Sequence, residues 1–93
     1  MSVDIEPRPL EVKALKNYLI YVKFKNNEEK IYDMKANFQY PFFKGLKDIE
    51  KFKKVKVSGI NIEWESGEDI APENLYNDSV PISEFNSEEL EEI

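Results

Sequence analysis

Residues 18–25 read YLIYVKFK, and β-branched and aromatic side chains dominate this run. One set of alternate positions in it carries only apolar or aromatic side chains: Tyr18, Ile20, Val22 and Phe24. The other set ends in two lysines. This period of two predicts a β-strand that buries one face against a core.

The segments on either side predict antiparallel partners for this strand. Asn26 and Asn27 are of a residue type that tolerates positive φ, so we expect a tight turn directly into residues 29–34. Upstream, residues 10–14 alternate apolar and charged side chains, which predicts a weaker first strand. The first third of the chain therefore predicts a three-stranded meander.

The middle of the chain predicts one short helix on this sheet. Leu46, Ile49 and Phe52 recur every three residues among lysines, which is typical of an amphipathic helix, and Asp48 is its expected cap. Before it, Pro41 interrupts a cluster of four aromatic residues. We expect that cluster to be a connecting segment that covers one edge of the core.

Two further strands are predicted over residues 55–64, where the apolar alternation changes parity across Ser58-Gly59. A two-residue turn at Ser58-Gly59 would pair Val57 with Ile60 and keep the apolar residues on one face. A bulge in one continuous strand would preserve the face equally well. We prefer the hairpin because Gly59 supplies turn geometry.

The end of the chain predicts a helical turn and then little order. Pro72 occupies a plausible first helical position. Residues 77–93 hold six acids and only scattered apolar side chains, so we expect them to form an acidic, flexible C-terminal tail. The prediction is a single α+β domain over residues 1–76: an antiparallel sheet of about five strands, in the order β-β-β-α-β-β, with one packed helix and a short C-terminal helical turn.

Charge divides the chain into unlike segments. The net charge is −6, but residues 44–56 hold six lysines against two acids, whereas residues 57–93 hold eleven acids and no base. An acidic chain argues against nucleic acid as the main partner, because affinity for phosphates comes largely from cationic side chains. The lysine-rich segment is the only candidate patch, and it can equally be a solvated face that pairs with the acidic half.

The chemistry of a possible site is narrow, because the chain contains neither Cys nor His. Thiolate metal sites, disulfides and the usual near-neutral base are therefore excluded. Asp33, Asp69 and Glu73 are the remaining carboxylates that could hold Mg²⁺ or perform acid/base chemistry if they converge. The alternative is structural: Asp69 caps the helical turn, and Asp33 bonds a neighbouring turn. We assign no catalytic or metal-binding residue and expect no cofactor.

One sheet face is the best candidate for an interface. Leu19 and Tyr21 lie on the side of their strand opposite the predicted core, and nothing else in the chain is predicted to cover it. Trp64 could anchor a partner, although its place in an apolar alternation also fits the core. Asp69 and Tyr76 complete the candidate interface.

The pattern as a whole resembles a known bacterial family. Residues 64–69 read WESGED and residues 72–76 read PENLY; together with Tyr-Leu-x-Tyr-Val-x-Phe over residues 18–24, they resemble the domain-of-unknown-function 2442 family over about residues 7–76. One departure is Asn26-Asn27-Glu28, where the family commonly has a glycine turn. The resemblance implies a compact α+β fold without an established activity. It also implies that some members are encoded beside another small domain, as in toxin–antitoxin pairs.

These observations favour a non-catalytic protein-binding module, namely the acidic partner in a toxin–antitoxin-like gene pair, whose own partner is another, basic protein. The alternatives are a nucleic-acid-associated regulator and a minimal carboxylate- or metal-dependent enzyme. The absence of His, Cys and a phosphate-binding glycine loop favours binding. Residues 1–6 lack the features of a signal peptide, and no apolar run reaches membrane-helix length. We therefore expect a cytoplasmic protein without membrane contact, either a monomer or a weak homodimer.

Overall fold

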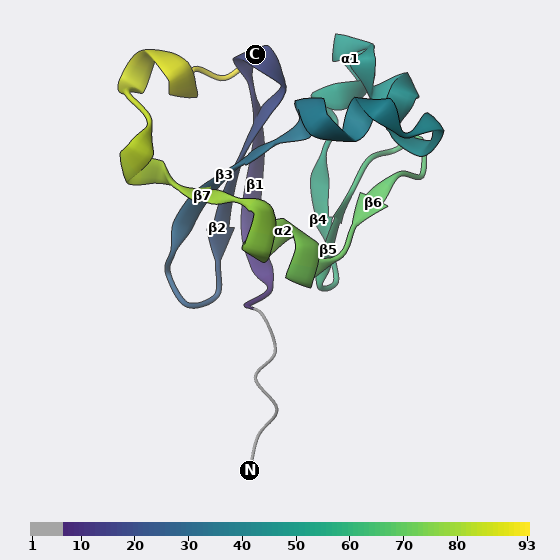
Figure 1. Cartoon of the computed structure of the whole chain (residues 1–93). Coiled ribbons are helices and arrows are strands. Elements are labelled where there is room, and N and C mark those ends of the chain that lie inside the picture. Colours follow the sequence, from purple (N-terminus) through teal and green to yellow (C-terminus); the bar gives the residue numbers. More distant parts are fainter. Residues whose placement is uncertain (1–6) are drawn as a thin grey trace.

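The computed structural model describes residues 7–93, so the first six residues of the predicted domain lie outside the described part. The fold is α+β, as predicted, but it contains two antiparallel sheets rather than one sheet of about five strands (Figure 1). One sheet has four strands in the order β1-β2-β3-β7, and the other has three in the order β4-β5-β6.

The four-stranded sheet is built on the predicted meander. β1 (Pro9–Leu15) pairs with β2 (Leu19–Phe24), and β2 pairs with β3 (Glu29–Asp33), all antiparallel. The hairpin between β2 and β3 is confirmed, and Asn27 adopts a φ of 73° in its turn, as this residue type allows. The fourth strand, β7 (Val80–Pro81), comes from the end of the chain and pairs with β3.

The three-stranded sheet consists of β4 (Lys56–Ser58), β5 (Asn61–Glu63) and β6 (Asp69–Ile70). β4 and β5 form the predicted hairpin. The strand β6, which was not predicted, pairs with β5 after a tight turn in which the backbone N–H of Trp64 donates to the carbonyl of Glu68 at 2.8 Å.

The register of the second hairpin differs from the prediction by two residues. Val57 pairs with Ile62 rather than with Ile60, so Gly59 and Ile60 form the turn in place of Ser58 and Gly59. Gly59 has a φ of 60°, in the left-handed region that glycine adopts readily. Ile60 is consequently 56% exposed instead of lying on the shared apolar face.

All helices are short. The two α-helices are α1 (Ile49–Phe52) and α2 (Pro72–Asp78), and the 3-10 helices are η1 (Lys16–Tyr18), η2 (Met34–Gln39), η3 (Pro41–Lys47), η4 (Ile82–Glu84) and η5 (Ser87–Leu90). Asp48 caps α1, as predicted, by accepting from the backbone N–H of Glu50 at 3.0 Å. Leu46, which was expected to be in the same helix, belongs to η3. Within the described residues, none of these helices is long and apolar enough to cross a membrane.

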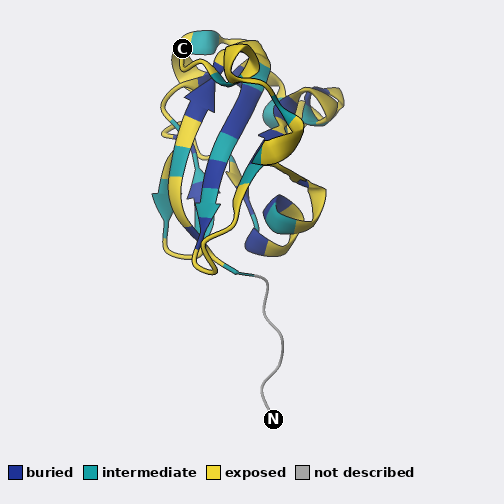
Figure 2. Ribbon diagram, turned by 90° about the vertical axis from the view of Figure 1, so that its left-hand side faces the viewer, coloured by how far each residue is buried: buried dark blue, intermediate teal, exposed yellow. Residues whose placement is uncertain are grey.

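The main core lies between the inner face of the four-stranded sheet, the second sheet and the helices that connect them. Figure 2 shows the alternation of buried and exposed bands along the strands that this arrangement requires. The buried side chains of the main core are Ala14, Ile20, Val22, Phe24, Tyr32, Met34, Phe38, Leu46, Phe52, Ile62, Trp64, Ile70 and Leu75. The buried face predicted for β2 is therefore confirmed.

The outer face of the four-stranded sheet is covered by the C-terminal segment, residues 82–93 (Figure 1). A small second cluster consists of the buried side chains Leu15, Leu19 and Ile31. Packed against it are Ile82, Phe85 and Leu90 of the C-terminal segment. The backbone N–H of Lys16 also donates to the carbonyl of Glu91 at 2.8 Å. The three apolar residues of the C-terminal segment are widely spaced in the sequence, but they pack against the same cluster. The structure therefore does not show the flexible tail that the sequence predicted.

Candidate functional site

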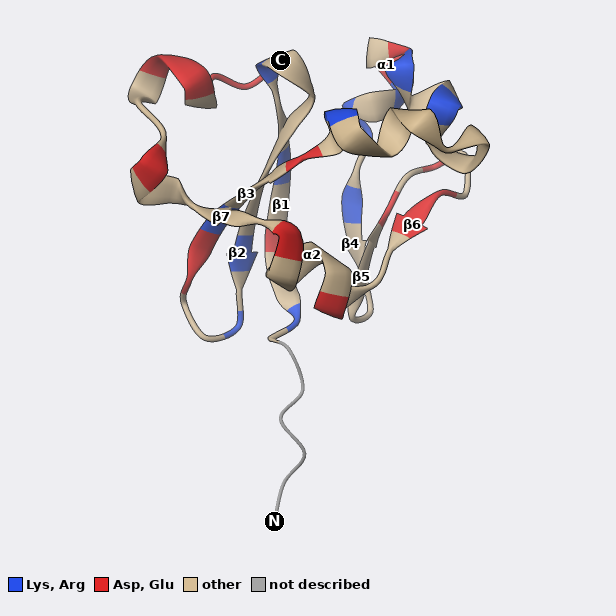
Figure 3. Ribbon diagram, viewed as in Figure 1, with Lys and Arg blue, Asp and Glu red and all other residues tan. Residues whose placement is uncertain are grey.

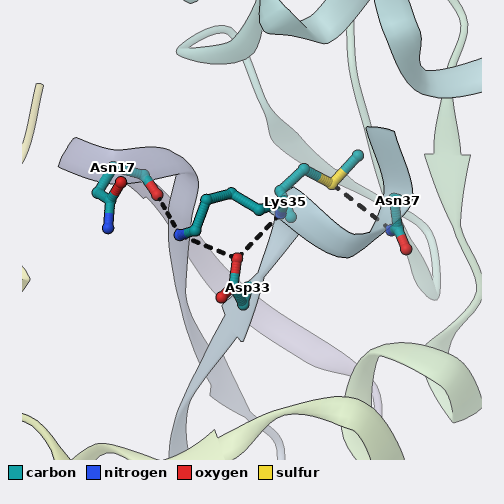
Figure 4. Close-up of polar contacts among 5 residues, drawn as sticks. Asn17, Asp33, Lys35 and Asn37 are labelled. Carbon is teal, nitrogen blue, oxygen red and sulfur yellow. Dashed lines mark hydrogen bonds and ion pairs between the residues drawn. The ribbon is translucent and has the colours of Figure 1, made fainter. Parts of the chain in front are cut away.

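Asp33, one of the carboxylates proposed for a catalytic or metal site, interacts with residues close to it. Oδ1 of Asp33 accepts from the backbone N–H of Lys35 at 2.9 Å and lies 3.1 Å from Nζ of Lys35, which also donates to the carbonyl of Asn17 at 2.8 Å (Figure 4). Asp33 therefore caps η2, and the prediction that it bonds a neighbouring turn is confirmed.

Asp69 does not cap the following helix, so that prediction is wrong. It lies in β6, where it pairs with Glu63 and accepts from Nδ2 of Asn61 at 3.4 Å. The cap position of α2 belongs to Ala71, whose side chain makes no hydrogen bond, and Glu73 lies in the first turn. Among residues 7–93, no group of three or more acidic residues could hold a metal ion.

Two of the five residues predicted for the interface are buried. Trp64 is 1% exposed, and its indole Nε1 donates to the carbonyl of Phe52 at 2.8 Å. Leu19 is 6% exposed beneath the C-terminal segment. In this structure neither side chain offers surface to a partner.

Tyr21 is half-buried beside the same segment. Its hydroxyl donates to Oε2 of Glu29 at 2.6 Å, and Nζ of Lys13 lies 5.7 Å from its ring centroid. Burial, reinforced by the Glu29 carboxylate, raises the pKa of the Tyr21 phenol. Tyr21 lines a hollow of about 280 Å³ together with Ile82 and Leu90. The predicted apolar face exists, but the chain's own C-terminal segment lies over it.

Tyr76 connects α2 to the turn between β2 and β3. Its ring packs edge to face on Phe24 at 5.1 Å, and its hydroxyl donates to the carboxylate of Glu28. That bond and a second one from Asn26 lower the pKa of Glu28. Nζ of Lys30 lies 4.0 Å above the Tyr76 ring and donates to the Tyr76 carbonyl at 2.9 Å. The role that these contacts define for Tyr76 is structural.

The lysine-rich segment, residues 44–56, is partly paired with acids of the chain itself. Nζ of Lys54 lies 3.5 Å from Glu65, and Nζ of Lys56 lies 3.9 Å from Glu63. Figure 3 shows basic positions around α1 and on β4, away from the acids of α2 and the C-terminal segment. The expectation of pairing with the acidic half is met for these two lysines.

A pocket of about 310 Å³ lies where η2 and η3 meet β6 and α2. We call it the aromatic-acidic pocket. Its lining residues are Tyr32, Asn37, Tyr40, Phe43, Asp69, Ile70, Ala71, Asn74 and Asp78. Of the residues predicted for the interface, Asp69 is in this lining, and the others are elsewhere.

The floor of the pocket is buried and its rim is exposed. Tyr32 and Ile70 are each 5% exposed, whereas Tyr40 is 54% exposed. Tyr40 has extended backbone geometry because Pro41 follows it, and this break between two 3-10 helices leaves its ring in solvent. Phe42, which packs on the lining residue Phe43, is 57% exposed.

The charge of the pocket is uniformly negative. Its lining contains two carboxylates, Asp69 and Asp78, but no Lys or Arg, and neither carboxylate forms an ion pair within the described residues. Burial raises the pKa of the Tyr32 phenol, and the charge of Asp78 adds to this effect. The opposing contribution is a hydrogen bond of 2.7 Å from Nδ2 of Asn37 to the Tyr32 hydroxyl. This arrangement can accept hydrogen bonds from a cationic group.

One feature of the sequence indicates this pocket. Four aromatic residues within six positions, with a proline among them, are more than one short connection can bury on a single side. Phe38 is buried and Phe43 half-buried, while Tyr40 and Phe42 remain exposed. The segment therefore both covers the core edge, as expected, and presents aromatic surface.

The comparisons with known proteins locate the chain in one family. Neither a curated protein nor a solved structure matches it. The family model described as "Protein of unknown function (DUF2442)" matches residues 9–81, which span all the strands from β1 to β7. The resemblance read from the sequence is thereby confirmed, and the chain belongs to the DUF2442 family.

Proposed function

We propose that this protein is a non-catalytic protein-binding module that docks a basic protein at the aromatic-acidic pocket. The observation that carries the proposal is exposed aromatic surface at the pocket. Tyr40 in the lining is 54% exposed, and Phe42, which packs on the lining residue Phe43, is 57% exposed. Within the described residues, the two carboxylates of the lining form no ion pair. Aromatic side chains are enriched at the centres of protein interfaces, because they bury large areas at small entropic cost.

The distribution of charge supports a basic partner. Residues 57–93 carry eleven acids and no base, and they include β6, α2 and the C-terminal segment. A field of one sign accelerates encounter with a partner of opposite charge and weakens as salt rises. The acidic member of a toxin–antitoxin-like gene pair would bind its partner in this way.

The test is affinity capture from a lysate of the source organism with four baits: the parent chain, Tyr40→Ala, Phe42→Ala and Ile60→Ala. Ile60 is the matched control because it is 56% exposed, close to the value for Phe42, but lies in the β4–β5 turn. We expect one basic protein to bind the parent and Ile60→Ala at low salt and to be lost from both aromatic variants.

Two results would contradict the proposal. One is that no protein distinguishes the aromatic variants from Ile60→Ala. The other is that the protein which distinguishes them is acidic, or that its retention is insensitive to salt. Far-ultraviolet circular dichroism of each bait shows whether the fold is intact, as we expect for substitutions of exposed side chains.

A further inference from the structure

We propose that the aromatic-acidic pocket binds the guanidinium group of an arginine side chain, presented by the basic partner. This inference rests on the proposed function and specifies what the pocket recognises. It is carried by three features of the pocket: its size, the hydrogen-bond acceptors that the described residues leave unused, and its aromatic walls.

The size of the pocket fits one side chain. Pockets for small organic ligands commonly have volumes of about 300–1,000 Å³. At about 310 Å³, this pocket is at the lower limit of that range. Its floor, formed by Tyr32 and Ile70, is buried and suits the aliphatic part of a long side chain.

Three side chains of the pocket lining have hydrogen-bond acceptors that the described residues leave unused. Asp69 accepts one hydrogen bond, at 3.4 Å, and Asp78 accepts none within the described residues. Asn37 uses Nδ2 towards Tyr32 and the sulfur of Met34, and within residues 7–93 its Oδ1 accepts no hydrogen bond. A guanidinium group has five N–H donors in one plane and can satisfy several such acceptors together, which an ammonium group does less well.

The aromatic walls favour the same group. Tyr40 and Phe43 line the pocket, and Phe42 packs edge to face on Phe43 with 4.9 Å between ring centroids. A planar guanidinium stacks on aromatic faces and keeps its edge free for carboxylates. Two lysines close in sequence to the lining residues Tyr32 and Asn37 interact with other groups: Lys30 lies over Tyr76, and Lys35 pairs with Asp33.

The experiment is a titration of the full chain, labelled with ¹⁵N, with the end-blocked peptide Gly-Arg-Gly, followed by amide chemical shifts. The matched probe is the end-blocked peptide Gly-citrulline-Gly, which replaces the guanidinium group by a neutral urea of similar shape. We expect saturable shifts for amides of residues 37–43 and 69–78, and binding of the citrulline peptide weaker by about tenfold or more.

Variants test the roles of the two carboxylates. Asp69→Asn and Asp78→Asn should each weaken binding of Gly-Arg-Gly by about threefold to tenfold, and the double variant should abolish saturable shifts. Glu88→Gln is the control, because it removes the same charge from the C-terminal segment, outside the pocket lining. It should leave the affinity within about twofold.

The inference is overturned if Gly-Arg-Gly causes no saturable shifts in residues 37–43 and 69–78, or if the citrulline peptide binds equally well. It is also overturned if Glu88→Gln weakens binding as much as Asp78→Asn, because general charge attraction would then explain the shifts. These results leave the capture experiment intact. A partner lost on Phe42→Ala would still support protein binding, while arginine recognition in this pocket would be rejected.

Discussion

The hollow beside Tyr21 and the aromatic-acidic pocket are similar in volume, at about 280 and 310 Å³, but they differ in what lies over them. Ile82 and Leu90 of the C-terminal segment line the first. The lining of the second comes from β3, η2, η3, β6 and α2, and Tyr40 at its rim is mostly exposed.

This difference shows that the packing of the rest of the chain determines which apolar surface stays exposed to a partner. Leu19 and Tyr21 resemble interface residues when their strand is considered alone. The C-terminal segment, with apolar side chains at positions 82, 85 and 90, removes that face from solvent. The aromatic segment, residues 38–43, was expected only to connect two elements and cover one edge of the core. It leaves Tyr40 and Phe42 exposed to solvent.

The largest expected effect is from Leu19→Ala. Leu19 is 6% exposed and packs in the second cluster, so its truncation should lower the free energy of unfolding by about 2–4 kcal/mol. The control is Leu10→Ala, because Leu10 is 49% exposed, and we expect a change within about 0.5 kcal/mol. Urea unfolding measures the free energy of unfolding of both variants. Equally small losses for the two would show that the Leu19 face is exposed to solvent.

A chain that ends at Pro81 should remain folded but be less stable. It retains every paired strand from β1 to β7 and loses the three apolar contacts of the C-terminal segment. The lost burial is partly offset by the entropy that the released residues regain, so we expect a net loss of about 1–2 kcal/mol. A dispersed amide spectrum with a lower urea midpoint is the expected result. A collapsed spectrum would mean that residues 82–93 are essential to the fold, and an unchanged midpoint would mean that they do not pack.

The smallest effect concerns alkaline pH. The pKa of Tyr21 is raised in the folded state, so the folded state holds the phenol proton more tightly than the unfolded state does. This contribution is fully present below the ordinary tyrosine pKa of about 10 and is lost as the pH rises above it. Tyr21→Phe should therefore lose less stability than the parent between about pH 9.5 and 11.5, as measured by the urea midpoint. A decline as steep as that of the parent would show that Tyr21 is not buried against Glu29.

The sequence predicted those parts of the fold that depend on local alternation. Residues 18–25 and the turn at Asn26-Asn27 contain their own period and turn chemistry, so β2, β3 and their pairing could be predicted. The register of β4 and β5 could not, because a slip of two residues keeps Val57 and Ile62 on the same face. The apolar alternation along the chain is therefore the same for the predicted and the observed register.

The long-range packing of the C-terminal segment could not be predicted from periodicity either. Positions 82, 85 and 90 follow neither a strand nor a helix period, so their shared contact with the second cluster has no local signature. The aromatic-acidic pocket combines residues 32–43 with residues 69–78, which come together only in the folded chain. Asp69 was predicted as a cap and as an interface residue; it lies in β6 and lines the pocket.

The central claim is that the chain covers the Leu19 face itself and leaves the aromatic-acidic pocket open. The most direct test is to measure the relaxation that a soluble nitroxide induces in side-chain NMR signals. It reports the solvent access of both regions in one sample. The exposed reference signals are the methyl groups of Leu10 and Ile60, which are 49% and 56% exposed.

We expect the ring signals of Tyr40 and Phe42 to relax as strongly as these references, and the methyl signals of Leu19 and Ile31 to relax several-fold less, because these two side chains are 6% and 1% exposed. The account is contradicted if Leu19 and Ile31 relax as fast as Ile60. It is equally contradicted if the rings of Tyr40 and Phe42 are as protected as Leu19.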